Sequence, residues 1–544
     1  MKQFRIMLWV LSLVALFGVA CSNVEPRVEE PVWDEAIYVA YANIENIHTK
    51  ADLANIDLSR LEHSLRNELT SEERADIDQL MALLRNPSIA GIDVGKPAYV
   101  AIRQLSSDGD PKHASLALEL CDAQALDTAL ESLRDKVNIE SFTLEGDTRI
   151  IRFNATSYVG YNNERMVALH CDVEGMDPHS ELLKLLAYLP ADMSRFGGRD
   201  VALHIDTRKL FSIIVGEPAQ NIEPASESEE QTDESSAEEE LLGNFWEAYY
   251  QYLTDESRMI VGLTFENGSI LLDSDISRIN ENANRIFVEA NGSNLKMLDK
   301  SPIVILNAGI NGEVASNLLN TAVDAAMELN QIPASNEINI VKNIALGIVS
   351  SMQGDLTLAL SDAEGRLIDD VFNGKKLVFT TANALFASEV KDDYIMQNIS
   401  LYGGSFLQKK GSNKYFASMF GNNIHIGDKG NRFYVGVNNN GENKTPSASN
   451  EEWSNNVNGS YVYSMIDFKK LFNTSFGRAA LSTIYQNAQS SSERDLAKLF
   501  AERADHLFIL CNGGEDCAHG EIMLTLVDGQ TNALNQIITI ANNL

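Results

Sequence analysis

The order of apolar and polar residues predicts the same local pattern four times along the chain. In each case an apolar strand runs into a polar turn and then into helical sequence, and such internal similarity indicates a repeated unit. The second and fourth cases agree closely, as Ile205-Asp-Thr-Arg-Lys-Leu-Phe211 and Ile466-Asp-Phe-Lys-Lys-Leu-Phe472. The four strand-to-helix segments are residues 37–47, 201–211, 303–311 and 461–472.

After each of the four strand-to-helix segments, alternating apolar residues predict further strands. Period-two alternation bounded by Asp-Gly, Asn-Gly or Gly-Gly is typical of hairpins. Two units then close with an amphipathic helix, for which Asp122 and Asp528 are the expected N-caps. One helix has Leu126, Leu130 and Leu133 on one face, and the other has Leu534, Ile538 and Ala541. The alternating stretches are residues 98–105, 115–120, 259–265, 269–272, 356–360, 507–511 and 521–527.

This arrangement predicts an α+β fold with mainly antiparallel sheets flanked by helices, because strands and helices mix without a regular βαβ rhythm. Meander-like stretches at 142–169 and 402–437 occupy matching places, so the chain looks duplicated. The first half is expected at 32–278 and the second at 300–544, with the Asn-rich stretch 279–300 between them. A chain of 544 residues is also too long for a single core.

The N-terminal sequence predicts export and lipidation. Residues 1–20 have a short positive region, an apolar run and small residues, which is the layout of a signal peptide. Gly18-Val-Ala-Cys21 resembles the bacterial lipobox, so Cys21 is the expected lipid attachment site and 21–31 a tether. The alternative is a soluble secreted protein with an incidental cysteine. Ser22 favours the outer membrane, with the periplasmic or cell-surface face left open.

The charge is strongly acidic. The chain has 77 Asp and Glu against 43 Lys and Arg, a formal net charge of −34. Such a surface repels nucleic acid, so no nucleic-acid partner is expected. Residues 217–241 contain ten acidic residues and no Lys or Arg, which predicts a disordered acidic loop. Calcium binding there is the alternative, although disordered carboxylates do not preorganise a site.

Two short stretches carry a family resemblance. With the lipobox, the strand Ile37-Tyr-Val-Ala40 and the stretch from Leu84 to Val100 resemble a family of Bacteroidetes lipoproteins that is catalogued only as a domain of unknown function. The resemblance implies an envelope location and an architecture. It implies no catalytic residues.

The cysteines offer two candidate disulfides. Cys511 and Cys517 lie at the two ends of an expected hairpin loop, and export leads to an oxidising compartment. Free thiols, or a metal site with His519, are the alternatives. Cys121 and Cys171 each end an apolar strand and form a weaker candidate pair.

Motifs for catalysis, cofactors and metals do not stand out. Ser388-Glu-Val-Lys391 and Ser293-Asn-Leu-Lys296 match a loose Ser-x-x-Lys pattern without its companion elements. Asp273-Ser-Asp275 is interpreted as an acidic turn. Trp246, Tyr249, Tyr250 and Leu253 recur at helical spacing and indicate a buried helix face, or alternatively a platform for sugar rings. No catalytic residue, metal ligand or cofactor is assigned.

The sequence therefore favours a non-catalytic envelope lipoprotein that binds or scaffolds. It would be held to a membrane through lipid on Cys21, with a protein or glycan partner. The alternative is an envelope hydrolase acting on glycan or peptide through a carboxylate pair that only the fold brings together. A third hypothesis, a ligand carrier, requires an apolar cavity.

Overall fold

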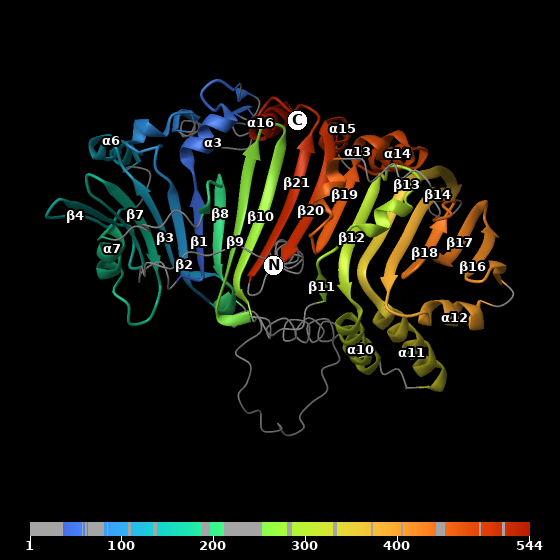
Figure 1. The fold of residues 1–544 in the computed structure, drawn as a ribbon. Helices are drawn as coiled ribbons and strands as arrows, with labels where there is room; N and C mark the ends of the chain where they lie inside the picture. Colours follow the sequence, from blue (N-terminus) through green and yellow to red (C-terminus); the bar gives the residue numbers. More distant parts are fainter. Residues whose placement is uncertain are drawn as a thin grey trace, which may run out of the picture. The chain divides into compact units, whose positions relative to one another are not determined.

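The computed structural model divides the chain into two compact units (Figure 1). The first unit holds the described residues between 36 and 210, together with 253–277 and 528–543, and the second holds those between 278 and 527. The segment 528–543 thus groups with the first unit, whereas the sequence placed it in the second half. The structure describes residues 36–56, 58–59, 62–63, 81–83, 85–106, 110–133, 139–187, 196–210, 253–279, 286–329, 335–370, 374–403, 406–441, 452–488, 491–513 and 517–543.

The strands of the first unit form a sheet in the order β4-β5-β6-β7-β3-β2-β1-β8-β9-β10. From β4 to β9 every neighbouring pair is antiparallel. The bounds are β1 Tyr38–Ala42, β2 Ala98–Leu105, β3 Pro111–Glu119, β4 Ser141–Glu145, β5 Thr148–Arg152, β6 Ser157–Tyr161, β7 Arg165–Cys171, β8 Val201–Asp206, β9 Leu253–Glu266 and β10 Ser269–Ile279.

The second unit has the strand order β15-β16-β17-β18-β14-β13-β12-β19-β20-β21, and each neighbouring pair is antiparallel. The short strand β11 (Phe287–Val288) pairs with β12 beyond the end of β19. The bounds are β12 Val304–Asn311, β13 Met352–Asp370, β14 Gly374–Val390, β15 Gln408–Gly411, β16 Lys414–Met419, β17 Asn422–Asp428, β18 Arg432–Val437, β19 Val462–Asp467, β20 Ala504–Gly513 and β21 Cys517–Leu526.

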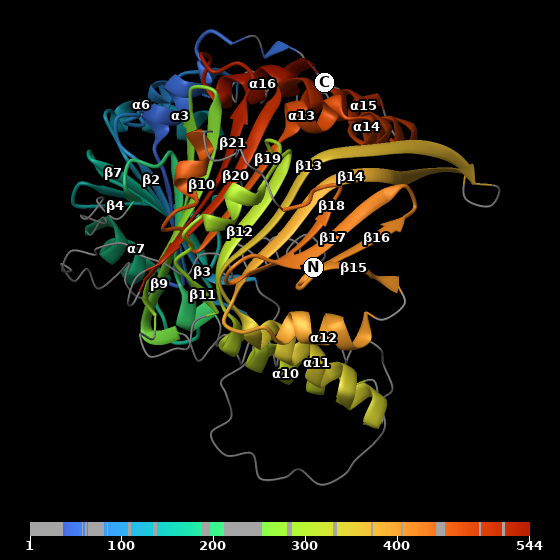
Figure 2. The same cartoon turned by 45° about the vertical axis from the view of Figure 1, so that its right-hand side comes forward.

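Helices accompany both sheets, which confirms the α+β class and the mainly antiparallel pairing. Figure 2 shows α10, α11 and α12 together at one end of the second unit's sheet. The first unit has α3 Ile44–Ala51, η1 Pro87–Ala90, α6 Ala123–Leu133, α7 Pro178–Ala187 and α16 Ala533–Asn543. The second has η3 Ser293–Met297, α10 Gly312–Leu329, α11 Asn336–Ser351, α12 Tyr394–Tyr402, η6 Glu452–Asn456, α13 Phe468–Asn473, α14 Ser475–Asn487 and α15 Ser491–Arg503.

One of the two predicted helix N-caps is present in the structure. Asp122 accepts the N–H of Ala125 at 3.1 Å, as an N-cap of α6 does, and Leu126 packs in the core beside Ile151. Asp528 instead accepts the N–H of Gln530 in the preceding turn, and Asn532 accepts the N–H of Leu534 at the start of α16. The predicted cap at Asp528 is therefore wrong, because α16 begins at Ala533, five residues later.

Each sheet has a large core on one face and a smaller apolar cluster on the other, because Ile150 and Ile151 of β5 belong to different clusters, as do Ala387 and Phe386 of β14. In the first unit, α7 packs against β6 and β7, and its Leu182 and Leu185 join a core that also includes Val39 of β1 and Tyr99 of β2. In the second, the segment around η3 places Leu295 and Leu298 against Ile305, Leu385 and Met465. Among the described helices, none has the length and apolar character needed to cross a membrane.

Candidate functional site

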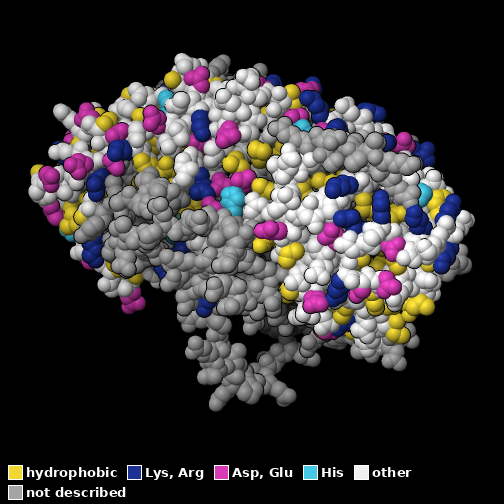
Figure 3. All heavy atoms as spheres, viewed as in Figure 1, with side chains coloured by type: hydrophobic (Ala, Val, Ile, Leu, Met, Phe, Trp, Pro, Cys, Tyr) yellow, Lys and Arg dark blue, Asp and Glu magenta, His cyan; other side chains and the backbone are white. Residues whose placement is uncertain are grey.

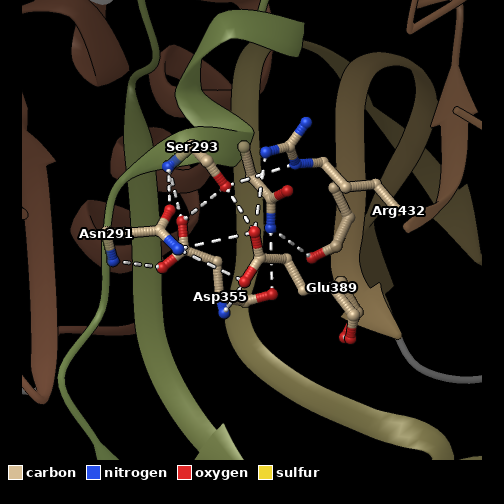
Figure 4. A network of polar contacts seen from close by, with 8 residues as sticks. Asn291, Ser293, Asp355, Glu389 and Arg432 are labelled. Atoms are coloured by element: carbon tan, nitrogen blue, oxygen red, sulfur yellow. Dashed lines mark hydrogen bonds and ion pairs between the residues drawn. The ribbon is translucent and has the colours of Figure 1, made fainter. Parts of the chain in front are cut away.

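A polar network fastens the segment before β12 to the second unit's sheet (Figure 4). Asn291 and Ser293 belong to that segment, while Asp355, Glu389 and Arg432 come from β13, β14 and β18. Asp355 is fully buried. It accepts the N–H of Asn291 at 2.7 Å and the N–H of Ser293 at 2.6 Å, so one carboxylate fixes two main-chain donors.

Glu389 completes the network. Its carboxylate accepts the hydroxyl of Ser293 at 3.0 Å and the N–H of Asp355 at 3.3 Å, and lies 3.5 Å from the guanidinium of Arg432. Gly354 has a φ of +86°, and a Cβ there would lie 2.3 Å from Glu389 Oε2. A glycine at this position therefore lets Glu389 reach across the strand.

The network has the character of a structural anchor. Nucleophilic catalysis needs a serine with a base within hydrogen-bond reach. Two carboxylates lie within that reach of the Ser293 hydroxyl, Asp355 at 3.2 Å and Glu389 at 3.0 Å, but both already accept main-chain N–H groups, and Arg432 Nε donates to the same hydroxyl at 3.2 Å. Lys296 is exposed, and Lys391 pairs with Glu313 at 2.8 Å, so neither lysine serves the serine of its motif. The fold places Ser293, from the first Ser-x-x-Lys match, beside Glu389, which lies within the second match. This contact does not pair a serine with a lysine.

A second cluster joins two carboxylates and an arginine in the first unit. Asp273 and Asp275 lie on β10, so their interpretation as an acidic turn is wrong. Both pair with Arg199, whose Nε donates to Asp273 at 2.6 Å. Burial opposes the charge of Arg199, but hydrogen bonds from its guanidinium to the two carboxylates outweigh this and raise its pKa. A Cβ on Gly262 would lie 2.0 Å from Arg199 Cδ, so this glycine makes room for the side chain.

A third cluster is buried beneath α7. Arg103 pairs with Glu181, and His113 Nε2 lies 3.6 Å from the same carboxylate. Cys171 is the cross-strand neighbour of His113. Burial raises the pKa of the Cys171 thiol, and burial followed by the nearby Arg103 charge lowers the pKa of His113. A neutral thiol beside a neutral imidazole is not an activated nucleophile.

The lowered pKa of His113 predicts a loss of stability in acid. The unfolded chain takes up a proton as the pH falls through about 6.5, while the folded state resists it. Stability from this residue is therefore present above that pH and is lost below it. We expect His113→Gln to flatten the decline in melting temperature between about pH 7 and pH 5. Parallel thermal unfolding of both proteins measures this, and identical slopes would contradict it.

Neither candidate disulfide is formed in the structure. Cys121, Cys171 and Cys511 are free thiols. Cys171, at the end of β7, lies across from His113 near the start of β3, whereas Cys121 follows the other end of β3, eight residues after His113. At ~3.3 Å per residue the two cysteines are about 26 Å apart. The predicted Cys121–Cys171 link is therefore wrong.

The hairpin cysteines are also out of register. Cys511 faces Gly520 across the hairpin, and burial raises its pKa to about 12. Cys517 begins β21, and its side chain lies outside the described residues. Because the two are not cross-strand neighbours, the geometry expected for their disulfide is absent. Within the described ranges, no three His, Cys, Asp or Glu side chains gather closely enough to hold a metal ion.

Other predicted features fall outside the described residues. These are the signal peptide, Cys21 with its tether, the acidic stretch 217–241, and Trp246, Tyr249 and Tyr250. Leu253, the last member of that aromatic helix face, instead begins strand β9.

An open apolar groove lies on the sheet of the second unit, between β13, β14 and the hairpin β16–β17. Its volume is about 380 Å³. Asn422 is its polar lining residue, and its side chain is already bonded to Thr380 O at 3.1 Å and to Asn438 Nδ2 at 2.9 Å. The other lining side chains are apolar: Leu360, Phe379, Ala382, Ala384, Met419, Phe420, Ile424 and Val437.

Phe420 stands out among the lining residues. It occupies the β16–β17 turn with a φ of +50°, a left-handed conformation that disfavours a bulky residue, and its exposed fraction is 91%. An exposed aromatic held at a conformational cost points to function. The groove was not predicted from the sequence. Phe420 before Gly421, a position where such turns favour Asn, is the local signal that points to it.

Comparison with known proteins gives a limited result. A family model described as "Domain of unknown function (DUF4836)" matches residues 30–174, which supports an uncharacterised domain family over about a quarter of the chain. No curated protein matches the chain. Two similar solved structures are titled "Structure of crystal form IV of TP0453" and "Structure of crystal form III of TP0453". The first is 14% identical with a TM-score of 0.25, covering 45% of this chain and 77% of that chain. The second is 13% identical with a TM-score of 0.26, covering 47% and 82%.

Proposed function

We propose that this chain is a non-catalytic envelope lipoprotein that binds an acyl chain in the groove of its second unit. The observation that carries this proposal is the groove itself. Eight apolar side chains line it, and its single polar side chain has its hydrogen bonds satisfied inside the protein. A ligand with polar groups would lose hydrogen bonds to water there without replacement, so an aliphatic chain is the chemistry that fits.

The charged clusters favour binding over catalysis. A glycosidase-like mechanism needs one carboxyl group as acid and a second carboxylate free to act on water or sugar. Asp273 and Asp275 lie together, but both are paired with Arg199. Ser293, Asp355, Glu389 and Arg432 likewise satisfy one another.

The proposed location in the cell envelope rests on the N-terminal sequence. Residues 1–20 would direct export, and lipid on Cys21 would hold the folded body beside the outer membrane. Such a tether keeps the groove near membrane lipids, whose acyl chains match its lining. The outer membrane and the lipid anchor are parts of this proposal.

We further propose that the two units arose by duplication. Support comes from the identical strand order, in which β1–β10 and β12–β21 take the same places. Asp206 and Asp467 end matching strands, and each accepts the N–H of the lysine three residues later. Each also lies across from a basic residue, Arg258 at 3.2 Å and His506 at 3.5 Å. The terminal cross-strand pair is also alike in the two units. Glu119 lies across from Arg165 between β3 and β7, and Glu389 lies across from Arg432 between β14 and β18.

The experiment that tests the ligand proposal is Phe420→Asn. Asparagine accepts the left-handed conformation, so the variant should be more stable by about 1 kcal/mol. Losing the aromatic side chain from the groove should weaken binding of a fluorescent long-chain fatty-acid analogue by about tenfold or more. Fluorescence titration and chemical unfolding of the Cys21→Ser protein measure the two effects.

Phe406→Asn is the matched control. Phe406 is also an exposed phenylalanine of the second unit, with an exposed fraction of 85%, but it does not line the groove. Its substitution should leave the affinity unchanged. No binding by the parent protein, or equal loss of affinity in both variants, would refute the ligand proposal.

A further inference from the structure

Strand β4 is an unprotected edge of the first unit's sheet. It pairs with β5, and among the described strands it has no second partner. All five of its residues are exposed, and the exposed fractions of Phe142 and Leu144 are 54% and 65%. Unpaired main-chain groups along an edge invite another strand, so proteins normally blunt such edges.

The outermost strand of the other sheet shows that protection. Strand β15 has only four residues, carries Lys409 and Lys410, and has a register shift between Lys409 and Gly411. Short length, lysine and irregular pairing are the usual devices against strand addition. Strand β4, Ser-Phe-Thr-Leu-Glu, has no lysine, proline or register shift.

The hairpin sets which groups of β4 face outward. Gly146 and Asp147 form a two-residue loop closed by Glu145 and Thr148. Hydrogen-bonded and non-bonded pairs alternate from such a closing pair, which leaves the main chain of Phe142 and Leu144 facing away from β5. Figure 1 shows β4 as the outermost strand of its unit.

We propose that β4 pairs antiparallel with β4 of a second copy of this chain, about a two-fold axis at Thr143. Self-pairing is favoured because the strand is complementary to itself in this register. Phe142 faces Leu144 of the second copy, which gives two apolar cross-strand pairs. Thr143 faces Thr143 of the second copy. Glu145 faces Ser141, so no like charges oppose each other, and its carboxylate lies 3.0 Å from His179 within its own chain.

The resulting dimer is expected to be weak. One short strand and two apolar pairs fall below the roughly 1,000 Å² of surface that stable complexes bury. A covalent trap therefore tests the proposal better than the elution position of the protein does.

Cysteine crosslinking gives a test specific to the register. In a protein with Cys21→Ser and Cys121→Ser, Thr143→Cys should form a disulfide-linked dimer under mild oxidation, because antiparallel neighbours lie within disulfide range. Ser141→Cys is the matched control. In the proposed register its two copies lie about 13 Å apart, so its crosslinking should be at least about tenfold slower.

A second change tests the role of the strand. Phe142→Lys with Leu144→Lys, added to the Thr143→Cys protein, should abolish the dimer while circular dichroism stays unchanged, since both side chains are exposed in the monomer. Equal crosslinking of Thr143→Cys and Ser141→Cys, or none at Thr143→Cys, would overturn the proposal. So would a dimer that survives the lysine pair. If β4 instead binds a strand of another protein, Thr143→Cys should fold normally and form no disulfide-linked dimer, which is one of the results that overturn the proposal.

Discussion

Arg199→Met is expected to lower the free energy of unfolding of the first unit by about 3–5 kcal/mol. Arg199 neutralises Asp273 and Asp275 on β10, and Asp273 is buried. Removing the cation leaves two carboxylates of like charge close together on one strand without its neutralising charge. Urea unfolding measures the loss, and hydrogen exchange should place the weakened region in β8, β9 and β10.

The control for this prediction restores the charge balance. Replacing a whole buried ion cluster with neutral groups is often nearly neutral, whereas removing one member is costly. Arg199→Met combined with Asp273→Asn and Asp275→Asn should therefore recover a large part of the lost stability. If the triple variant were as unstable as the single one, packing of the arginine side chain rather than charge would explain the loss, and the interpretation of the cluster would be wrong.

Asp355→Ala should have a similarly large effect in the second unit. The Asp355 carboxylate accepts the N–H groups of Asn291 and Ser293. Its removal takes away the acceptor of the Asn291 N–H and leaves the Ser293 N–H with Asn291 Oδ1 at 2.9 Å as an acceptor. A lost buried partner costs about 1–3 kcal/mol, and Asp355 also lies 3.2 Å from the Ser293 hydroxyl, so we expect a loss of about 2–4 kcal/mol. Hydrogen exchange should become faster at these two amides before the strands of the sheet are affected.

Asp362→Ala is the matched control for Asp355→Ala. It lies on the same strand, but its side chain is half-exposed and 3.9 Å from its partner Lys300. Exposed ion pairs contribute at most about 1 kcal/mol, so this variant should unfold nearly as the parent does. An equal loss in both variants would mean that the strand itself, and not the anchor of the η3 segment, is sensitive to substitution.

The α+β class followed from the sequence because its signals are local. Asp467 is a cap that its own sequence specifies, since its side chain accepts the N–H of a residue three positions later. Asp206 in the matching motif makes the same hydrogen bond at the end of its strand, to the N–H of Lys209. The face of α6 that carries Leu126 was predictable for the same reason, because helical periodicity alone places it.

The buried face of β13 shows where such reasoning fails. The alternation over residues 356–360 predicts a strand, and apolar side chains on one of its faces would ordinarily point to the core. The structure reverses this, because Asp355 and Thr357 are fully buried and the exposed fraction of Leu358 is 47%. Asp355 is satisfied by a segment more than sixty residues earlier in the chain, and Thr357 by Asn307 on β12.

The candidate sites depended on register and on distant partners in the same way. Asp273 and Asp275 can be recognised as acidic from the sequence, but their neutralisation needs Arg199, which lies before β8. The groove needs β13, β14 and the β16–β17 hairpin together, and the open edge at β4 needs the order of the whole sheet.

The sequence by itself determined the α+β class, the helical or alternating character of many elements and the cap at Asp122, since these depend on neighbours within a few residues. Only the tertiary structure decided which face of each strand is buried, which charges neutralise one another and which apolar side chains stay open. The physical reason is that burial and electrostatic pairing are set by groups brought together through folding, and their separation along the chain leaves no periodic signal.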